Sequence, residues 1–513
     1  MSATLHNQEY SNPDRHHYDV VIIGSGLGGL LCAVMLAKEG MKVCVLEKNK
    51  QIGGCLQTFS LHKTVFDSCV HYVGGLGEGH TLHRIFSYAG IMSMLKLFSF
   101  DPDGFDRIAF GNEEISYPQA VGKENFIAQL VSHFPDQQSN LRHYIESLQH
   151  VGDHFPLYRL RNGDALEKSK VAHWEILKTL QSISPNKRLQ QILAGNNLLY
   201  AGVPHKTPFY LHALVLESYI HSAHKLVPGS SQIAKLLWRE LQAHGGVVFR
   251  HAHVSGLIEE KGLIQYAETQ HGQRFYAKQF ISDIHPQALL PILKSKLVRS
   301  AYRKRIEGLE QSTSAFMLNL VLRPHCVPMR YHNLYWHATD NVWSATTVDS
   351  TLWPHQYALY FTEDQRYPGF AESLSVLTYM PFAEVSSWTN THNHSGNPNV
   401  RCAEYEDFKA EKAEILLNKV LERFSDLKGN ILAQGAATPL TYRDYGNNPE
   451  GSLYGILKDV SKPAETQISV KTKIPNLLQT GQNVNLHGVL GVSITAVATC
   501  AEMLGMDYVL KKM

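Results

Sequence analysis

Residues 18–47 read YDVVIIGSGLGGLLCAVMLAKEGMKVCVLE, and this stretch decides the fold. Residues 18–23 form a short apolar run rich in β-branched side chains, which is typical of a buried strand. Residues 30–38 favour a helix that ends at Gly40, and residues 41–46 form a second apolar run that finishes at Glu47. This order of strand, glycine-rich turn, helix and strand predicts a βαβ unit.

The glycine-rich turn of this unit predicts a dinucleotide site. Gly24 permits a tight turn, Gly26 lets the backbone approach a pyrophosphate, and Gly29 lets the helix pack closely on the strand. The diphosphate is then expected on the unpaired N–H groups of the helix N-terminus. Glu47 accepts hydrogen bonds from ribose hydroxyls and disfavours a 2′-phosphate.

Two further segments favour FAD as the dinucleotide. Residues 52–59 (IGGCLQTF) add a second glycine pair directly after the acidic strand end, as in flavoproteins of the two-dinucleotide-binding type. Residues 477–491 (LLQTGQNVNLHGVLG) predict a strand, a turn at Gly481 and entry into an apolar helix over 492–504, whose dipole can stabilise the reduced flavin ring. The predicted cofactor-binding residues are Gly24, Ser25, Gly26, Gly28, Gly29, Glu47, Lys48, Gly53, Gly54, Cys55, Val254, Gly481, Gln482, Asn483, Gly488 and Val489.

Three of these residues have specific expectations. In related flavoproteins, the backbone at a position like Val254, in a strand predicted over 254–258, pairs with adenine. Cys55 stands where most such proteins have an arginine, so a charge contact with the phosphate must come from elsewhere or be absent. Asn483 replaces a frequent acidic residue and is expected to hydrogen-bond the ribityl chain without adding charge.

Composition excludes several classes of partner. A chain of 513 residues is long enough for two or three packed units, and 48 Lys plus Arg against 46 acids give no electrostatic case for nucleic acid. Seven scattered cysteines without a C-x-x-C pair favour a reducing, cytoplasmic location. The uncharged runs 20–37 and 488–501 are explained by the glycine turn and the apolar helix, so we expect no transmembrane span.

Several separated segments resemble the family of phytoene desaturases, carotenoid isomerases and retinol saturases, and among these the retinol saturase branch. They are GGCLQTF (53–59), VFDSCVHYVGG (65–75), HALVLESYIHSAHKLVPGSSQI (212–233), TPLTYRDY (438–445), GSLYG (451–455) and LLQTGQN (477–483). The chain departs from the family at Gly229-Ser230, where two glycines are usual, and at residues 386–401, which look like an insertion.

The resemblance and the motifs together predict an α/β fold. A discontinuous Rossmann-type FAD domain is expected from residues 1–90, 220–292 and 465–513, with an inserted mixed-sheet and helical substrate domain from 91–219 and 293–464. Within the latter, residues 403–424 predict an amphipathic helix, whose apolar face is expected to carry Tyr405, Phe408, Ile415, Leu416 and Val420.

The resemblance implies an FAD-dependent oxidoreductase that transfers a hydride between flavin N5 and a carbon of a long apolar isoprenoid or polyene, most directly as a saturase. Desaturation or cis–trans isomerisation of a carotenoid would use the same residues. An alternative of another class is a flavin-loaded protein that binds a lipid without turnover. NADH or NADPH is a candidate external reductant, and the oligomeric state is left open.

Saturation also needs a proton donor, for which His71 is the first candidate because histidine titrates near neutral pH. The alternative is a hydrogen bond from His71 to backbone. Asp67 either orients His71 or caps the local turn, and the cap is favoured. His487 contacts the ring or the substrate, or serves the helix entry, while Tyr454, with Tyr442, supplies a phenol proton or lines a polyene tunnel.

Two remaining patterns concern membranes and metals. The apolar stretches 91–100 and 192–210 could form a mouth in peripheral contact with a membrane, although core packing explains them equally well. His251 and His253 share one face of a predicted strand but lack a third ligand, and His392 and His394 lie in a polar loop. No metal site is predicted.

Overall fold

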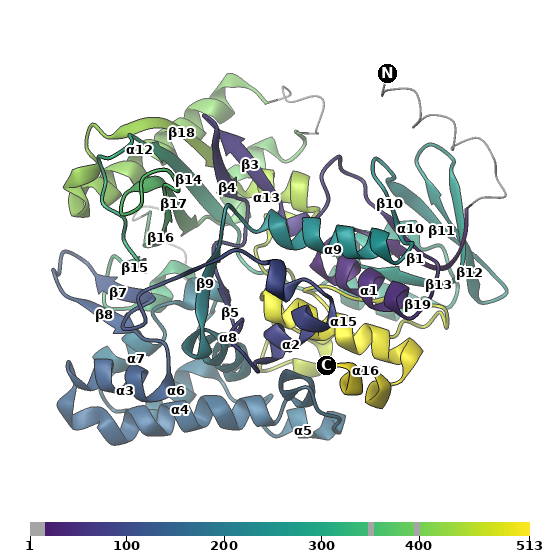
Figure 1. Ribbon diagram of the computed structural model, residues 1–513, viewed down its shortest axis with the longest axis horizontal. Helices are drawn as coiled ribbons and strands as arrows, with labels where there is room; N and C mark the ends of the chain where they lie inside the picture. Colours follow the sequence, from purple (N-terminus) through teal and green to yellow (C-terminus); the bar gives the residue numbers. More distant parts are fainter. Residues whose placement is uncertain (1–15, 347–352, 394–400) are drawn as a thin grey trace.

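This computed structural model describes residues 16–346, 353–393 and 401–513. Two seven-stranded sheets lie beside each other, and a layer of helices covers their lower side in the view of Figure 1. The first sheet and its helices lie on the right of Figure 1, and the second sheet lies at the upper left. The predicted α/β fold with an inserted mixed-sheet and helical part is therefore confirmed.

The first sheet is built around β1, whose last four residues are fully buried. Its strand order is β10-β2-β1-β13-β12-β11, and β19 pairs with the far half of β13. Pairing is parallel from β10 through β13 and on to β19. The two inner strands β1 and β2 carry continuous buried apolar runs, at residues 20–23 and 43–46, as expected of parallel strands covered on both faces. The strands are β1 (His17–Ile23), β2 (Val43–Leu46), β10 (Val247–Phe249), β11 (Val254–Glu260), β12 (Leu263–Thr269), β13 (Arg274–Ser282) and β19 (Leu477–Gln479).

Helix α1 (Leu27–Lys38) packs between this sheet and two other helices, and every residue from Leu27 to Ala37 is buried. Its partners are α15 (Gly488–Leu504) and α9 (Ser231–Ala243), so it is apolar all round. Both α1 and α15 begin earlier than predicted, at residues whose low helix propensity is overridden by packing. Further helices of this part are α2 (Thr81–Tyr88), α10 (Pro286–Ile292), α11 (Ser300–Glu307), α14 (Pro463–Thr466) and α16 (Met506–Lys512).

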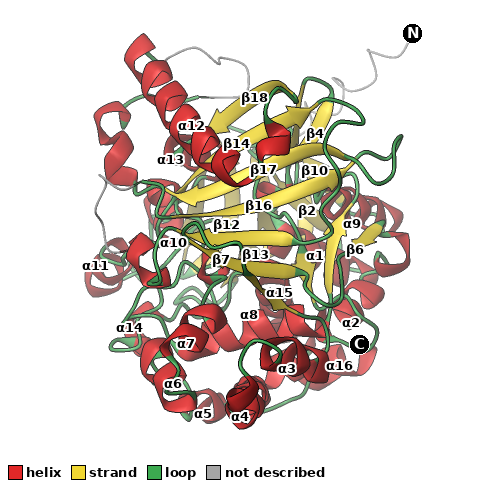
Figure 2. Ribbon diagram, turned by 90° about the vertical axis from the view of Figure 1, so that its left-hand side faces the viewer, coloured by secondary structure: helices red, strands yellow, loops and turns green. Residues whose placement is uncertain are grey.

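The second sheet has the order β18-β14-β17-β16-β15-β7-β8 and is antiparallel except for the pair β15 and β7. Figure 2 shows its strands stacked above the helical layer, with α12 (Ala403–Arg423) crossing the outer face. Tyr405, Leu416 and Val420 of α12 are buried as predicted, but Ile415 is 38% exposed, because the helix buries a narrower stripe than its sequence suggests. The strands and the following helix are β7 (Asp106–Phe110), β8 (Ser116–Gln119), β14 (Ala315–Leu322), β15 (Asn333–His337), β16 (Gln356–Glu363), β17 (Ala371–Tyr379), β18 (Ile431–Ala437) and α13 (Pro439–Gly446).

Short strands and a helical layer join the two sheets. The strands are β3 (Thr58–Leu61), β4 (Thr64–Asp67), β5 (Val73–Gly74), β6 (Leu97–Ser99) and β9 (Ala223–Leu226), and the helices are α3 (Lys123–Val131), α4 (Gln138–Asp153), α5 (Ala165–Ser169), α6 (Ile176–Ile183), α7 (Lys187–Leu193) and α8 (Phe209–His221). Strands of the first sheet come from all three segments predicted for the FAD domain, whereas β9 pairs with β5 and β6 instead. The exact domain boundaries stay a prediction.

The apolar stretches 91–100 and 192–210 are mostly part of the core. Ile91, Phe100, Ile192 and Leu198 are buried, so core packing accounts for them, and Met94 is the member with a large exposed surface, at 43%. None of the described helices combines the length and apolar character that crossing a membrane requires.

Candidate active site

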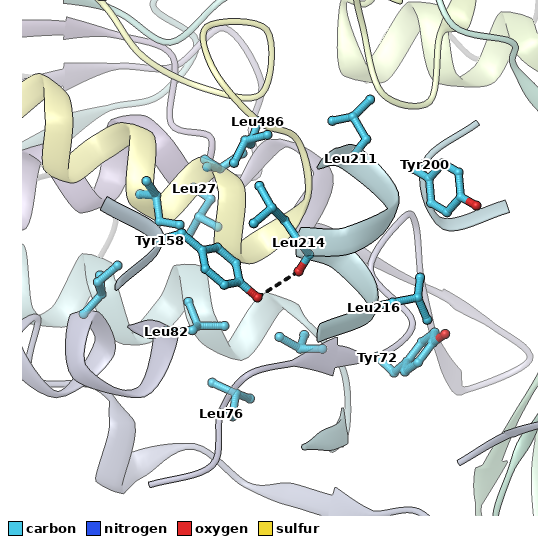
Figure 3. Packing of buried hydrophobic residues seen from close by; sticks show 14 of the residues in the cluster. Leu27, Tyr72, Leu76, Leu82, Tyr158, Tyr200, Leu211, Leu214, Leu216 and Leu486 are labelled. Atoms are coloured by element: carbon cyan, nitrogen blue, oxygen red, sulfur yellow. Dashed lines mark hydrogen bonds between the residues drawn. The ribbon is translucent and has the colours of Figure 1, made fainter. Parts of the chain in front are cut away.

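A cavity of about 760 Å³ lies where the carboxyl ends of the parallel strands meet the second sheet and α8. One end is lined by the glycine turn after β1 and by Glu47. The other end is lined by apolar and aromatic side chains, among them Leu211, Leu214 and Tyr158, whose packing is shown in Figure 3. The Tyr158 hydroxyl donates to the carbonyl of Leu214 at 3.0 Å, so even this phenol presents mainly its ring. The cavity therefore joins a polar nucleotide end to an apolar chamber.

The glycine turn is shaped so that backbone can approach a ligand. Gly24 has a φ of +99°, which side chains rarely adopt, and a Cβ on Gly29 would lie 2.3 Å from the carbonyl oxygen of Gly24. A Cβ on Gly26 would lie 2.5 Å from Asp283 Oδ2. The cradle thus depends on missing side chains, and the N-terminus of α1 opens beside it. This geometry fits the diphosphate of a dinucleotide.

Glu47 is held in place for ribose recognition. The residue is 5% exposed, and its carboxylate accepts hydrogen bonds from Ser25 Oγ at 2.5 Å, from Ser25 N at 3.1 Å and from Asn49 N at 2.8 Å. A carboxylate can accept about four hydrogen bonds, so capacity is left for a ligand hydroxyl. The residues at this end of the cavity fit FAD.

The structure brings the predicted cofactor-binding residues together. All of them line the cavity except Gly29, which lies behind it and makes the close helix–strand contact predicted for it. Asn483 also has a structural contact, because its Oδ1 accepts from the backbone N–H of Ile456 at 3.0 Å, and its bond to the ribityl chain stays a prediction.

Sequence reasoning missed Asp283, which follows β13 and lies against the glycine turn. Burial raises the pKa of Asp283 to about 8, although backbone N–H groups of Gly29 and Gly26 lower it. The side chain is therefore largely protonated at neutral pH and adds little charge beside the expected diphosphate. Asp283 could have been found from the sequence, because ligand-contacting polar residues often follow directly after a parallel strand.

His71 lies in the cavity wall and stacks on Tyr360, with ring centroids 4.4 Å apart. Burial lowers the pKa of His71 to about 3, so its ring is neutral at neutral pH. The charged imidazolium is therefore disfavoured there, and the role of His71 as the acid stays a prediction. Its Nε2 has no hydrogen-bond partner within the described residues and remains free to contact a ligand.

His487 and Tyr454 also line the cavity, with ring centroids 4.5 Å apart. The Tyr454 hydroxyl donates to the carbonyl of Leu198 at 2.7 Å, so Tyr454 lines the wall and its proton is engaged elsewhere. Burial lowers the pKa of His487 to about 4, and its Nε2 lacks a partner in the described part of the chain. Tyr442 also lines the cavity, and its hydroxyl has no hydrogen-bond partner among the residues that the structure describes.

Asp67 caps a helix and does not orient His71. Its Oδ1 accepts hydrogen bonds from Ser230 N and Ser230 Oγ, each at 2.7 Å, at the N-terminus of α9. The expected cap of the local turn is therefore wrong, because the partner of Asp67 is the N-cap residue of a helix that is distant in sequence.

The histidine pairs do not form metal sites. His251 and His253 lie in the turn before β11, and His251 has a φ of +59°, so the predicted strand is wrong here. His392 lies beside Asp444 and Arg443, and His394 falls outside the described residues. Over residues 16–346, 353–393 and 401–513, no group of three His, Cys, Asp or Glu side chains could hold a metal ion.

We expect Glu47→Gln to weaken flavin retention about tenfold. The amide loses charge-assisted hydrogen bonds worth roughly 1.5–3 kcal/mol, of which only part is recovered. The flavin absorbance that survives gel filtration at low protein concentration measures this. Glu268→Gln is the matched control and should retain flavin fully, because Glu268 lies on β12 outside the cavity lining and pairs with Arg274. Full retention by Glu47→Gln would remove Glu47 from the ribose site.

A nucleotide cradle that opens directly into an apolar chamber defines the class of protein, an FAD-dependent oxidoreductase with a Rossmann-type core. Residues 22–89 match the family described as NAD(P)-binding Rossmann-like domain. The chain is similar to the all-trans-retinol 13,14-reductase of Rattus norvegicus, with 25% identity covering 92% of this chain and 83% of that protein.

A 4,4'-diapophytoene desaturase of Staphylococcus haemolyticus is 20% identical over 86% of this chain and 89% of its own length. An oxidoreductase structure from Methanosarcina mazei, 14% identical, aligns with a TM-score of 0.62 over 93% of this chain and 99% of that one, and shows the shared fold. Over most of its length the chain is thus similar to retinol 13,14-reductases and to diapophytoene desaturases, and its N-terminal part matches a Rossmann-like family.

Proposed function

We propose that this protein saturates a carbon–carbon double bond of a long, apolar isoprenoid or polyene substrate, with reduced FAD as the hydride source. The observation that carries the proposal is the continuous cavity, in which the nucleotide cradle meets a chamber walled by Leu211, Leu214 and Leu377. Such a chamber excludes water and offers an apolar chain a dry, shaped surface.

Residues of this chain would hold the cofactor as follows. The turn at Gly26 and the N-terminus of α1 would bind the diphosphate, Glu47 the ribose, and the backbone near Val254 the adenine. The N-terminus of α15 would lie near the flavin ring, where His487 is also placed. Bound FAD would supply hydride transfer, and the protein would position the substrate and exclude water.

Reduction is the favoured direction because the all-trans-retinol 13,14-reductase matches at higher identity than the diapophytoene desaturase does. The desaturase relative supports a second candidate, oxidation of a polyene at the same cavity. The two candidates share every residue of the site and differ in the redox state of the flavin that meets the substrate.

The test is anaerobic mixing of the purified protein with retinol or a carotene, once with oxidised and once with chemically reduced flavin. Re-oxidation of the reduced flavin by the polyene is the expected result. Bleaching of the oxidised flavin would replace saturation by desaturation. Isomerised product without a net flavin change would indicate an isomerase, and no spectral or chemical change would favour a lipid carrier.

His71→Ala should keep flavin content and lower turnover by less than about tenfold, because a neutral ring contributes packing worth roughly 0.5–1.5 kcal/mol against Tyr360. The pH dependence of turnover should not move, since the pKa of His71 lies far below neutral. Flavin re-oxidation rates between pH 5 and 9 measure both. A loss of several hundredfold would restore His71 as the acid.

NADH or NADPH is the candidate external reductant, and anaerobic bleaching of the flavin by either one would establish it.

Uptake of substrate by peripheral contact with a membrane would involve exposed apolar residues such as Met94. Flotation of the protein with phosphatidylcholine vesicles, compared with flotation of Met94→Glu, tests this contact.

A further inference from the structure

A chain of buried hydroxyl groups leads from the cavity wall to a buried carboxyl group. Asp106 Oδ2 accepts from the Tyr72 hydroxyl at 2.8 Å, and the Tyr72 and Tyr335 hydroxyls lie 2.6 Å apart. The Tyr335 and Tyr360 hydroxyls lie 3.4 Å apart. Tyr360 and Tyr72 line the cavity, whereas Asp106 and Tyr335 lie behind its wall. The chain thus has one end at the substrate chamber and the other inside the protein.

The four residues come from separate elements and are fixed by packing. Asp106 begins β7, Tyr335 lies on β15, Tyr360 lies on β16, and Tyr72 precedes β5. Each is at most 4% exposed. Asn333 Nδ2 donates to Asp106 Oδ1 at 2.9 Å, so the second carboxyl oxygen is also held. Burying polar groups costs free energy unless each of them is hydrogen-bonded. Here the hydrogen bonds form a continuous series that ends at Tyr360 in the cavity wall.

The surroundings of Asp106 favour its protonated form. The titratable groups that face it are Tyr72, Tyr335, Tyr360 and, from α8, Tyr219, all of which burial keeps protonated. The amides of Asn333 and Asn196 complete its neighbours. Burial raises the pKa of Asp106 to about 7, while the hydrogen bonds from Asn333 and Tyr72 act in the opposite direction. The carboxyl group therefore gains and loses a proton near neutral pH.

We propose that Asp106, Tyr72, Tyr335 and Tyr360 form a proton relay that delivers the proton for saturation, with Tyr360 as the group that touches the substrate. This inference rests on the proposed function and identifies the group that would donate the proton during saturation. The sequence candidates leave that role open, because His71 is neutral and the Tyr454 hydroxyl is bound to a carbonyl.

The step balances as follows. One carbon of the double bond accepts a hydride, which carries two electrons, and the other carbon accepts the proton of the Tyr360 hydroxyl. The hydroxyls of Tyr335 and Tyr72 each pass one proton along, and Asp106 gives up its own. Asp106 is left as a carboxylate, with all hydroxyls of the chain turned toward it. After the product leaves, water that enters the cavity returns one proton to Asp106 through Tyr72, which lines the cavity and bonds the carboxylate.

The relay predicts a pH profile with a defined sign. Turnover requires protonated Asp106, so it should be highest below pH 7 and fall as the pH rises through about 7. Asp106→Asn cannot supply a proton and should lose roughly 10²–10⁴-fold in turnover together with this pH step. Asp106→Glu should restore part of the rate and the pH step. Tyr360→Phe and Tyr335→Phe should lose rate similarly, because each interrupts the chain.

Tyr144→Phe is the matched control. Tyr144 is a fully buried phenol whose hydroxyl lies 2.8 Å from His212 Nε2, in the helical layer and outside the cavity wall. Its removal should leave turnover and the pH profile unchanged. Melting temperature and flavin content of every variant show whether a loss of rate reflects a loss of folding.

The decisive measurement is independent of turnover. Difference infrared spectra of the wild-type holoenzyme minus Asp106→Asn, taken from pH 5 to 9, should show a protonated carboxyl band that disappears near pH 7, while the band of Asp283 cancels. A missing band, or one that does not titrate in this range, overturns the relay whatever the protein reduces. Turnover of Asp106→Asn within threefold of wild type overturns it as well. A wild-type protein that reduces no polyene overturns the proposed function yet leaves the infrared band, so the two failures are distinguishable.

Discussion

Gly29→Ala should lose flavin almost completely. The added methyl carbon would lie 2.3 Å from the carbonyl oxygen of Gly24 and 3.0 Å from Asp283 Oδ2. Because the nearest atom belongs to backbone, the glycine turn itself must move to make room. Overpacking of this kind costs about 1–3 kcal/mol or more, which corresponds to roughly a 10- to 100-fold loss of affinity where the displaced turn is the binding site.

Flavin absorbance per protein after gel filtration measures the loss, and circular dichroism reports the fold. The control is Gly256→Ala on β11 of the same sheet, where the new carbon would meet the flexible end of Ile258 at 3.4 Å. That variant should bind flavin as the wild type does. Full flavin occupancy in Gly29→Ala would show that the turn tolerates displacement and that its shape is not required for binding.

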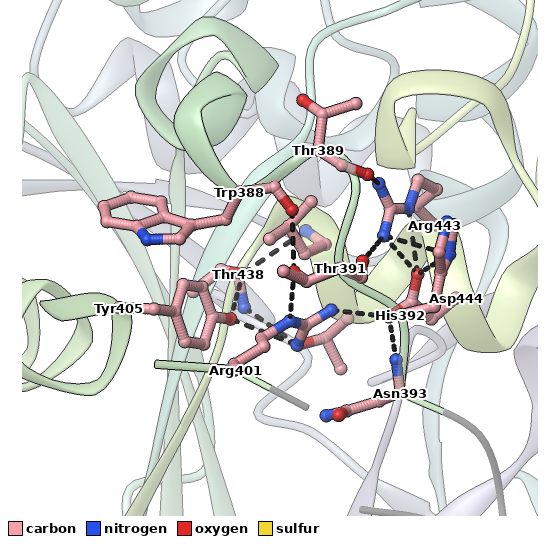
Figure 4. A network of polar contacts seen from close by, with 12 residues as sticks. Trp388, Thr389, Thr391, His392, Asn393, Arg401, Tyr405, Thr438, Arg443 and Asp444 are labelled. Carbon is pink, nitrogen blue, oxygen red and sulfur yellow. Dashed lines mark hydrogen bonds and ion pairs between the residues drawn. The ribbon is translucent and has the colours of Figure 1, made fainter. Parts of the chain in front are cut away.

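The second large effect concerns stability. Asp444 of α13 has a fully buried carboxylate that pairs with Arg401 and with Arg443 at 2.7 Å, and it accepts from Asn393 N at 2.7 Å, as Figure 4 shows. The Arg401 side chain is only 4% exposed. Asp444→Ala would leave two guanidinium groups without their buried counter-charge. We expect a loss of about 3–5 kcal/mol in the free energy of unfolding.

Thermal and chemical unfolding of the purified protein measure this loss. Asp340→Ala is the control, because Asp340 also pairs with an arginine, Arg188, but its side chain is 80% exposed. An exposed pair contributes about 0–1 kcal/mol, so this variant should melt close to the wild type. An equal loss of unfolding free energy in the two variants would show that burial does not strengthen the ion pairs of Asp444.

The nucleotide half of the site could be predicted from sequence because its determinants are local. Gly24, Gly26 and Glu47 lie in one βαβ unit, so spacing alone places them around a common ligand. The helix starts were less predictable, since the glycines at the beginning of α1 and α15 have low propensity and become helical through packing. Local patterns also placed His251 and His253 on a strand that the structure does not contain.

The proton relay could not be predicted in this way. Asp106, Tyr72, Tyr335 and Tyr360 are far apart in the chain, and only the pairing of β7 with β15 and of β15 with β16 brings three of them together. A buried aspartate at the start of a strand carries no sequence signal that separates it from a turn residue. His71 is the more obvious acid by residue type, but burial lowers its pKa and disfavours the charged ring.

The small sheet of β5, β9 and β6 has a mechanical consequence. Val73 of β5 pairs with His224 of β9, and Leu97 of β6 pairs with Leu226 of β9. Backbone hydrogen bonds therefore join three segments that connect the part of the first sheet with the part of the second sheet. A hinge movement that separated the two sheets would have to break these hydrogen bonds. A long substrate is then expected to enter the cavity end first, past the side chains at its opening. The rate of turnover should depend on the length of the substrate more than on a movement of the two sheets.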